Sequence, residues 1–161
     1  MRIISSEIFV IYDTITYDNA TTSAHQDIWE LTNATLTRET TYSRFYETTT
    51  GTGAVMYTNF PNVKIIEFDL LQEDGATSDA LFGFYQDNSG KTTFQLRHLG
   101  ESVELNSWYK VKCIVEENKI TVINKDTGYE SIREFTGVVN RGRFATSGTT
   151  TALQFRNFKA Y

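Results

Sequence analysis

The fold of this chain is decided by the stretch Ser107-Trp108-Tyr109-Lys110-Val111-Lys112-Cys113-Ile114-Val115-Glu116-Glu117-Asn118-Lys119-Ile120-Thr121-Val122-Ile123-Asn124-Lys125. Every second position from 109 to 115 belongs to one apolar row, and this period of two is typical of a strand with one buried face. Three polar residues interrupt the alternation, and it resumes at Ile120 and Val122. Because Asn tolerates left-handed backbone, we predict a hairpin that turns at Asn118.

Similar short segments recur along the chain and predict an all-β protein. Aromatic residues make up 14% of the sequence, with eleven Phe and nine Tyr against two Met, a balance that favours strands. No stretch repeats apolar residues at helical spacing over three turns, so we expect little helix. Many short strands separated by Gly-bearing turns predict an antiparallel two-sheet β-sandwich. The expected strands, besides the hairpin, cover residues 8–17, 28–36, 41–48, 54–58, 63–72, 80–86, 92–98, 129–135, 143–145 and 152–161.

Length and charge limit the partners. The 161 residues predict one domain over 1–161, in which residues 1–7 form a linker or an extra edge strand. A net charge of −5 repels phosphate backbones, so we expect no nucleic-acid partner. No segment approaches the roughly 20 apolar residues of a membrane span, so we expect no membrane partner either. Cys113 has no second Cys to pair with and is expected to be a buried thiol.

Four parts of the sequence carry a family resemblance: Leu81-Phe82-Gly83-Phe84-Tyr85-Gln86-Asp87; Phe94-Gln95-Leu96-Arg97; Asn106-Ser107-Trp108-Tyr109-Lys110-Val111 with Asn118-Lys119-Ile120-Thr121-Val122; and Leu153-Gln154-Phe155-Arg156-Asn157-Phe158-Lys159. In this order they resemble the concanavalin A-like jelly roll of LamG-type and carbohydrate-binding modules, over residues 8–161. Such modules occur on glycan-degrading enzymes, bacterial surface proteins and phage tail or baseplate proteins. The resemblance therefore implies a jelly-roll fold, lectin-like glycan binding and an extracellular, cell-surface or virion location.

The segment Glu67-Phe68-Asp69-Leu70-Leu71-Gln72 is similar to the Glu-x-Asp-x-x-Glu signature of retaining glucanases with this fold. Glu67 and Asp69 share one face of a strand, and that chemistry needs two carboxyl groups about 5 to 5.5 Å apart. The last position is Gln72, whose amide cannot exchange a proton at neutral pH and which faces the opposite side of the strand. We therefore expect no catalytic activity, and a small glucanase-like hydrolase remains as an alternative.

A structural calcium ion is implied by the resemblance, because modules of this kind often hold one between the first and last strands. Its oxygen ligands would come from Asp13, Asp18 and Asn157, or from Asp74 and Asp79. The alternative is that these are ordinary turn and capping side chains. No cofactor is required for the expected function.

A ligand surface is predicted by the residues that alternate with the aromatic core. If Phe45, Phe68 and Phe84 point inward, their polar and aromatic neighbours point outward on one concave sheet face. Sugars stack on aromatic rings and accept or donate hydrogen bonds at amides, carboxylates and guanidinium groups. Gly83 is expected to leave room for a ligand at the backbone. The predicted ligand residues are Arg44, Tyr46, Glu67, Asp69, Tyr85, Gln95 and Arg97, with Trp29 and Tyr57 at the rim.

Two interpretations of this face stay open. The first is a non-catalytic module that binds a cell-wall or cell-surface glycan or polysaccharide as part of a larger surface, phage tail or baseplate protein. The second is an Arg–Glu ladder across neighbouring strands with no ligand, as in a structural domain of a virion or surface assembly whose partners are neighbouring chains.

Overall fold

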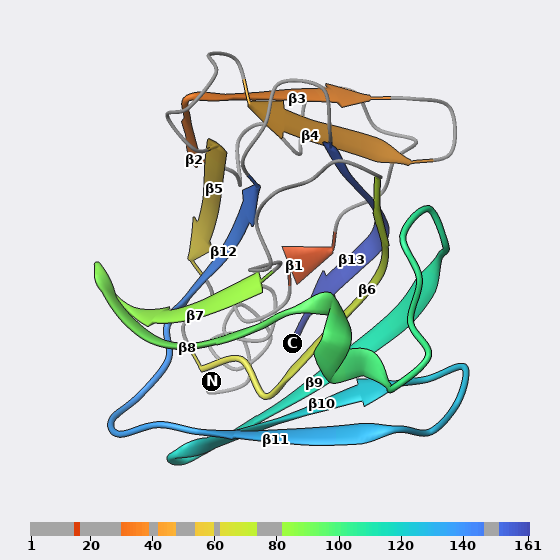
Figure 1. Cartoon of the computed structure of the whole chain (residues 1–161). Helices are drawn as coiled ribbons and strands as arrows, with labels where there is room; N and C mark the ends of the chain where they lie inside the picture. Colours follow the sequence, from red (N-terminus) through yellow and green to blue (C-terminus); the bar gives the residue numbers. More distant parts are fainter. Residues whose placement is uncertain are drawn as a thin grey trace, which may run out of the picture.

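The strands of the chain are arranged in two antiparallel sheets (Figure 1). The structure is a computed structural model, and it describes residues 15–16, 30–38, 42–47, 54–59, 62–73, 82–146 and 152–161. The elements are β1 (Ile15–Thr16), β2 (Glu30–Thr32), β3 (Ala34–Arg38), β4 (Ser43–Glu47), β5 (Ala54–Asn59), β6 (Ile65–Gln72), β7 (Phe82–Gln86), β8 (Ser89–Phe94), the 3-10 helix η1 (Leu96–Leu99), β9 (Tyr109–Glu116), β10 (Lys119–Asn124), β11 (Glu130–Glu134), β12 (Arg141–Thr146) and β13 (Ala152–Ala160).

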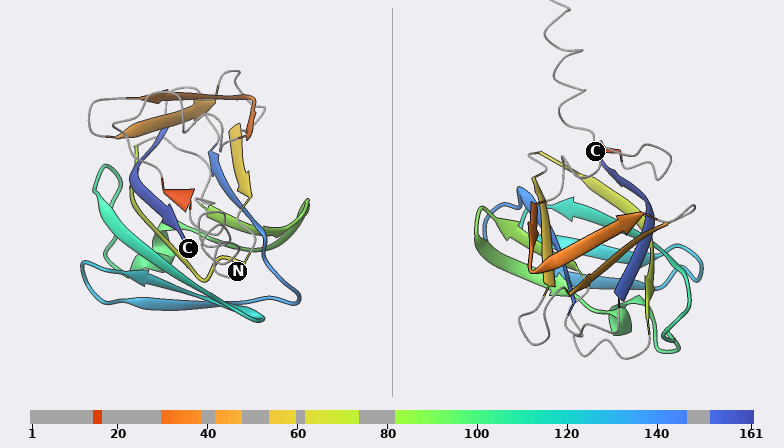
Figure 2. Two further views of the ribbon diagram at one scale, coloured as in Figure 1. Left: turned by 180° about the vertical axis from the view of Figure 1, so that it is seen from behind. Right: turned by 90° about the horizontal axis from the view of Figure 1, so that it is seen from above.

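The larger sheet has eight strands in the order β11-β10-β9-β6-β13-β4-β3, with β1 paired to β13. The smaller sheet has five strands in the order β2-β5-β12-β7-β8. Figure 2 shows this arrangement from behind and from above. These layers confirm the all-β, antiparallel two-sheet sandwich, and the pairing of β1 with β13 places the first described strand beside the last.

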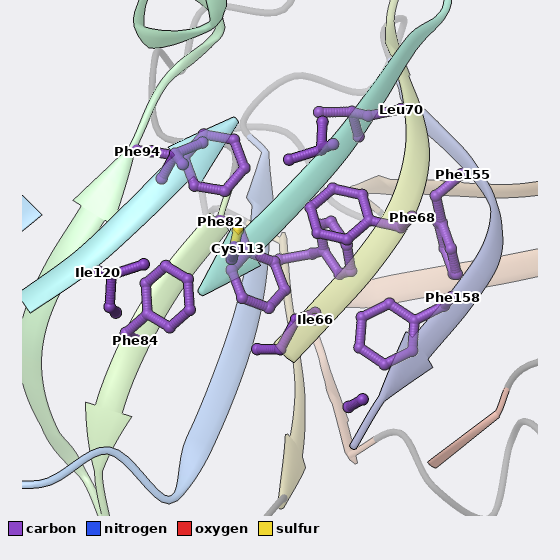
Figure 3. Packing of buried hydrophobic residues seen from close by; sticks show 14 of the residues in the cluster. Ile66, Phe68, Leu70, Phe82, Phe84, Phe94, Cys113, Ile120, Phe155 and Phe158 are labelled. Carbon is purple, nitrogen blue, oxygen red and sulfur yellow. The ribbon is translucent and has the colours of Figure 1, made fainter. Parts of the chain in front are cut away.

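Aromatic rings from both sheets fill the space between the layers (Figure 3). Phe68 comes from β6 of the larger sheet, where residues 66, 68 and 70 are buried and alternate with half-buried residues. Its ring centroid lies 5.4 Å from that of Phe82 and 5.2 Å from that of Phe144, which both belong to the smaller sheet. Burying a Phe side chain contributes about 1.5–3 kcal/mol, so the packed rings hold the two sheets together. Other fully buried rings in this cluster are Phe84, Phe94, Phe155 and Phe158.

The central hairpin forms as its sequence predicts. Strands β9 and β10 pair antiparallel, with Glu116 opposite Lys119 at the turn. Asn118 adopts a φ of 62°, the left-handed conformation expected there. Gly128 follows β10 with a φ of 77°, as its place in the next turn requires. Cys113 lies fully buried on the inner face of β9, as predicted.

Two predicted strands are interrupted within their expected ranges. The element expected over 28–36 is two strands, because Asn33 adopts a φ of 52° between β2 and β3 and the chain passes there from one sheet to the other. The strand expected over 92–98 ends at Phe94 and continues as η1. A 3-10 turn forms because the Gln95 carbonyl accepts from the His98 N–H at 2.9 Å, while the Gln95 N–H donates to His98 Nδ1 at 2.9 Å.

The part of the chain that the structure describes contains no helix long and apolar enough to cross a membrane. The proposed linker or edge strand at residues 1–7 lies outside the described residues.

Candidate functional site

The seven predicted ligand residues do not share one face. Arg44, Glu67 and Asp69 lie on the eight-stranded sheet, whereas Tyr85 lies on β7 of the five-stranded sheet. The backbone of Tyr46 belongs to β4, and its side chain lies outside the described residues. The prediction that these residues share a single concave face is therefore wrong. Alternation tells which side of its own sheet a residue occupies, but it does not tell to which sheet the strand belongs.

Gln95 and Arg97 are also displaced from the predicted face. Gln95 connects β8 to η1, and Arg97 lies within η1. Both line a pocket of about 210 Å³ at the end of the sandwich, together with Gln72 and Leu105. Because the chain leaves the sheet after Phe94, neither residue is on a strand next to Tyr85.

Glu67 on the eight-stranded sheet is held by two neighbours. Lys125 Nζ donates to Glu67 Oε1 at 2.8 Å, and Tyr161 Oη donates to Glu67 Oε2 at 2.9 Å. The hydrogen bond from Lys125 is the largest influence on this carboxyl and lowers the pKa of Glu67, although partial burial opposes it. Glu67 is therefore held in its ionised form.

Asp69 and Glu73 also accept hydrogen bonds from neighbouring side chains. Arg156 Nε and Asn157 Nδ2 donate to Asp69 Oδ2 at 3.0 and 2.9 Å. Arg44 binds Glu73 through Nε and Nη2 at 2.7 and 2.8 Å. These contacts form the cross-strand ladder that was one of the two interpretations of the predicted face, and they occupy the carboxylates that the other interpretation assigned to a ligand.

The glucanase-like alternative has little support from this geometry. Gln72 is buried, and it pairs with Leu153, whose side chain is buried as well. It therefore faces the core, on the opposite side of β6 from Glu67 and Asp69, as the sequence predicted. A retaining mechanism needs a second carboxyl group as the general acid, and the position that the signature gives to that acid is the amide Gln72.

The predicted calcium ligands are only partly described. Asn157 has a φ of 55° at an irregularity in the pairing of β13 with β6, and its side-chain amide binds Asp69. Asp13, Asp18, Asp74 and Asp79 lie outside the described residues. Within the described ranges, no group of three or more His, Cys, Asp or Glu side chains could hold a metal ion. The calcium site stays a prediction.

The outer side of the five-stranded sheet carries a different set of side chains, which we call the tyrosine–arginine face: Tyr57, Tyr85, Arg141 and Arg143. They come from three adjacent strands, β5, β7 and β12. Arg143 on β12 lies directly opposite Tyr57 on one side and Gly83 on the other. The rings of Tyr57 and Tyr85 meet edge to face with centroids 5.7 Å apart. Two aromatic rings and two guanidinium groups are thus gathered on one patch of the sheet.

Tyr85 lies across its own sheet because two glycines leave space for it. A Cβ added at Gly83 would lie 2.8 Å from Tyr85 Cε2, and one at Gly90 would lie 3.3 Å from Tyr85 Cε1. The space that we predicted for a ligand at Gly83 is therefore filled by the Tyr85 ring. The half-buried ring therefore lies close to the backbone of Gly83 and Gly90.

Arg143 lies beside both rings. Its guanidinium carbon is 5.4 Å from the ring centroid of Tyr85 and 5.9 Å from that of Tyr57. Its Nη1 donates to the Tyr85 hydroxyl oxygen at 2.7 Å. Burial raises the pKa of Tyr85, although the positive charge of Arg143 opposes this shift, so the phenol is neutral at physiological pH.

Arg141 supports the same patch from its edge. Its guanidinium carbon lies 4.1 Å from the Tyr57 ring centroid, a distance typical of a cation–π contact. It donates from Nη1 to Asn88 Oδ1 at 2.7 Å and from Nη2 to Glu30 Oε2. Its side chain is only 12% exposed, so Arg141 acts chiefly to hold Tyr57 and β2 in place.

A second hollow lies beside η1, and we call it the η1 pocket. Its volume is about 380 Å³, and its lining includes Tyr109, Asn124 and Tyr129. The Asn124 amide is already used, since Nδ2 donates to the Leu99 carbonyl at 2.9 Å and Oδ1 accepts from the Asp126 N–H at 3.0 Å. Tyr129, at 42% exposure, is the accessible aromatic side chain of this pocket.

Sequence reasoning missed both arginines of the tyrosine–arginine face. The signal was present, because Arg141-Gly142-Arg143-Phe144 alternates polar and small or apolar residues. The expected strand began only at residue 143, so Arg141 was left outside the strand and its alternation with Arg143 was not recognised. Tyr57, expected at the rim, lies at the centre of the patch instead.

Comparison with known proteins finds likenesses of structure. No protein-family model and no curated protein sequence matches the chain significantly. A solved structure described as a sialidase matches with a TM-score of 0.71 and 13% identity over 93% of this chain, which spans 18% of that chain. The carbohydrate-binding module CBM66 from Bacillus subtilis matches with a TM-score of 0.57 and 15% identity, covering 83% of this chain and 95% of that one. At these identities the likeness shows a shared β-sandwich fold.

Proposed function

We propose that this chain is a non-catalytic carbohydrate-binding module of the concanavalin A-like type that captures a glycan on its tyrosine–arginine face. The observation that carries the proposal is the cluster formed by the Arg143 guanidinium group and the adjoining Tyr57 and Tyr85 rings on the outer side of the five-stranded sheet. Aromatic rings offer apolar faces to the C–H groups of a sugar, and guanidinium groups donate to its oxygens. The likeness to a carbohydrate-binding module over 95% of that module's length supports the same function.

The ligand we propose is a saccharide of a cell wall or cell surface, which places the protein outside the cell, at a cell surface or on a virion. Binding at one half-buried patch is an equilibrium capture and is expected to be weak for a single copy. Several copies on one assembly, as in a surface or phage tail protein, would raise the avidity by 10²–10⁴-fold in favourable geometry. The proposal therefore needs no reaction at the site.

The test is a glycan array and affinity electrophoresis with the chain displayed in several copies. Tyr57→Ala and Tyr85→Ala each remove one ring of the patch. Tyr129→Ala is the matched control, because it removes an exposed ring at the η1 pocket instead. We expect each of the first two changes to weaken retention by about tenfold, the equivalent of roughly 1.4 kcal/mol, and the control to leave it unchanged.

Two results would overturn the proposal. The first is that the wild-type chain retains no saccharide on a broad array. The second is that binding occurs but is lost in Tyr129→Ala and kept in both face variants, which would move the site to the η1 pocket.

A further inference from the structure

We propose that the saccharide bound at the tyrosine–arginine face is acidic and that Arg143 holds its carboxylate. This inference rests on the proposed function, since it names the chemical class of the ligand for that face. It follows from two properties of the patch: its unequal ion pairing and its surplus of hydrogen-bond donors.

The two arginines of β12 differ in their partners although they point to the same side of the sheet. Arg141 forms an ion pair with Glu30 and a further hydrogen bond with Asn88. Arg143 forms no ion pair with any carboxylate of the described residues, and its one hydrogen bond goes to the neutral Tyr85 hydroxyl. Among the described residues, the positive charge at the centre of the patch therefore has no carboxylate partner.

Half-buried charges of this kind are normally paired, because removing a guanidinium group from water without a partner is unfavourable. On the eight-stranded sheet of the same protein, Arg44 and Arg156 follow that rule through Glu73 and Asp69, whereas half-buried Arg133 on β11 has no ion pair among the described residues. Arg143 departs from it at the point where two aromatic rings also meet. An anionic ligand would supply the missing partner.

Hydrogen-bond donors are also in excess at this point. The Tyr85 oxygen accepts from Arg143, so its own proton is free to be donated to another group. The raised pKa of Tyr85 keeps that proton in place at physiological pH. Within the described part of the chain Arg143 donates only from Nη1, which leaves N–H groups on Nε and Nη2 for a ligand. These groups call for a ligand rich in acceptor oxygens.

A carboxylate meets these requirements better than a hydroxyl group. Two parallel N–H donors of a guanidinium group match the two oxygens of a carboxylate in a bidentate pair, and the Tyr85 hydroxyl is placed to donate to the same group. A neutral sugar would satisfy the donors but leave the charge of Arg143 unpaired. Uronic and sialic acids combine a carboxylate with the C–H faces that Tyr57 and Tyr85 can stack against.

The net charge of the chain opposes the binding of an acidic saccharide. At −5, the protein as a whole repels anionic polymers. Preference for an acidic saccharide would therefore have to come from a local site and not from the general charge of the protein.

The experiment compares ligands that differ only in the carboxyl group. Isothermal titration with the full chain would use oligogalacturonate, a glucuronate-containing oligosaccharide and sialyllactose, each beside its carboxyl-reduced counterpart. Arg143→Gln removes the charge and keeps hydrogen-bond donors, and Arg143→Lys keeps the charge but not the bidentate geometry. Arg97→Gln, on η1, is the control for loss of one exposed positive charge away from the face.

We expect at least one acidic ligand to bind tenfold or more tightly than its reduced form. Arg143→Gln should abolish that difference, Arg143→Lys should retain part of it, and Arg97→Gln should leave it intact. Thermal melting of each variant shows whether it is folded, and the residual affinity of Arg143→Gln for the reduced ligand shows whether the patch is preserved.

Failure of this inference can be told apart from failure of the proposed function. If neutral saccharides bind through Tyr57 and Tyr85 as tightly as acidic ones and Arg143→Gln changes nothing, the acidic ligand is wrong and the binding module stands. If no saccharide of either kind binds, both proposals fall.

Discussion

Arg143 Nη1 donates a hydrogen bond of 2.7 Å to the hydroxyl oxygen of Tyr85, and this contact joins two neighbouring strands of the five-stranded sheet through their side chains. It fixes the direction of both groups. The guanidinium group is held beside the Tyr57 and Tyr85 rings, and the phenol proton is turned away from Arg143. The proposed ligand site depends on this pair more than on any other contact of the protein.

Removing the hydroxyl of Tyr85 tests the contact itself. In Tyr85→Phe the ring remains but Arg143 loses its acceptor, so we expect glycan binding to weaken several-fold. A typical hydrogen bond contributes only about 0.5–1.5 kcal/mol to stability, so unfolding in urea should shift little. Titration calorimetry and urea denaturation give the two values, and unchanged affinity would show that the hydroxyl takes no part in binding.

Gly83 tests the position of the Tyr85 ring. A Cβ at this residue would lie 2.8 Å from Tyr85 Cε2, which is too close, so Gly83→Ala must push the ring from its place. We expect a loss of binding comparable to that in Tyr85→Ala, with stability changed by no more than about 1 kcal/mol, because Ala is a better strand residue than Gly. Gly90→Ala is the graded control, since its Cβ would lie 3.3 Å from the ring. Equal binding by wild type and Gly83→Ala would contradict the described ring position.

The pH dependence of stability tests the ladder on the eight-stranded sheet. The pKa of Glu67 is lowered in the folded state, mainly by the hydrogen bond from Lys125. A carboxyl group with a lowered folded pKa adds stability above its unfolded pKa and loses that contribution as the pH falls through the folded value. The excess stability of wild type over Glu67→Gln should therefore be full at pH 7 and should shrink as the pH falls below about 4.5, the usual value for Glu. Urea denaturation at a series of pH values measures it, and a gap that grows on acidification would contradict the assignment.

Phe68 tests the packing between the sheets. Its ring contacts aromatic rings of both sheets, so Phe68→Ala should lower the free energy of unfolding by about 3–5 kcal/mol. Ile132→Ala is the control, because that side chain is 59% exposed on β11 and its loss should cost at most about 0.5 kcal/mol. Similar losses in the two variants would mean that Phe68 is not at the centre of the core.

Cys113 gives a chemical probe of the same core. Complete burial raises the pKa of its thiol, and only the thiolate reacts readily with disulfide reagents. We expect the folded protein to resist Ellman's reagent at pH 8 and the urea-unfolded protein to react with one equivalent. Rapid reaction in the native state would show that β9 opens easily.

The architecture could be predicted from the sequence because a strand with one buried face shows alternating apolar and polar residues in its own sequence. Residues 109–115 and 65–70 show that period, and their rows of buried side chains lie as predicted. The turn residues Asn118 and Gly128 adopt the positive φ values that their chemistry favours. Local rules were enough for these features.

The grouping of the site could not be predicted because it depends on which strands become neighbours. Glu67 and Tyr85 both alternate with buried Phe residues. Glu67 lies on the eight-stranded sheet and is paired with Lys125, whereas Tyr85 lies on the five-stranded sheet beside Arg143. Arg143 meets Tyr85 across 58 residues of sequence. The turn to η1 likewise depends on the His98 side chain accepting from the Gln95 N–H, which no strand pattern reveals.

The most direct test of the account is chemical-shift mapping of the ¹⁵N-labelled chain with the saccharide that binds best on the array. If the glycan occupies the tyrosine–arginine face, the largest shift changes will fall on β5, β7 and β12, around Tyr57, Tyr85 and Arg143. Changes confined to η1 and the 127–129 turn, or to β6 and β13 of the eight-stranded sheet, would contradict it.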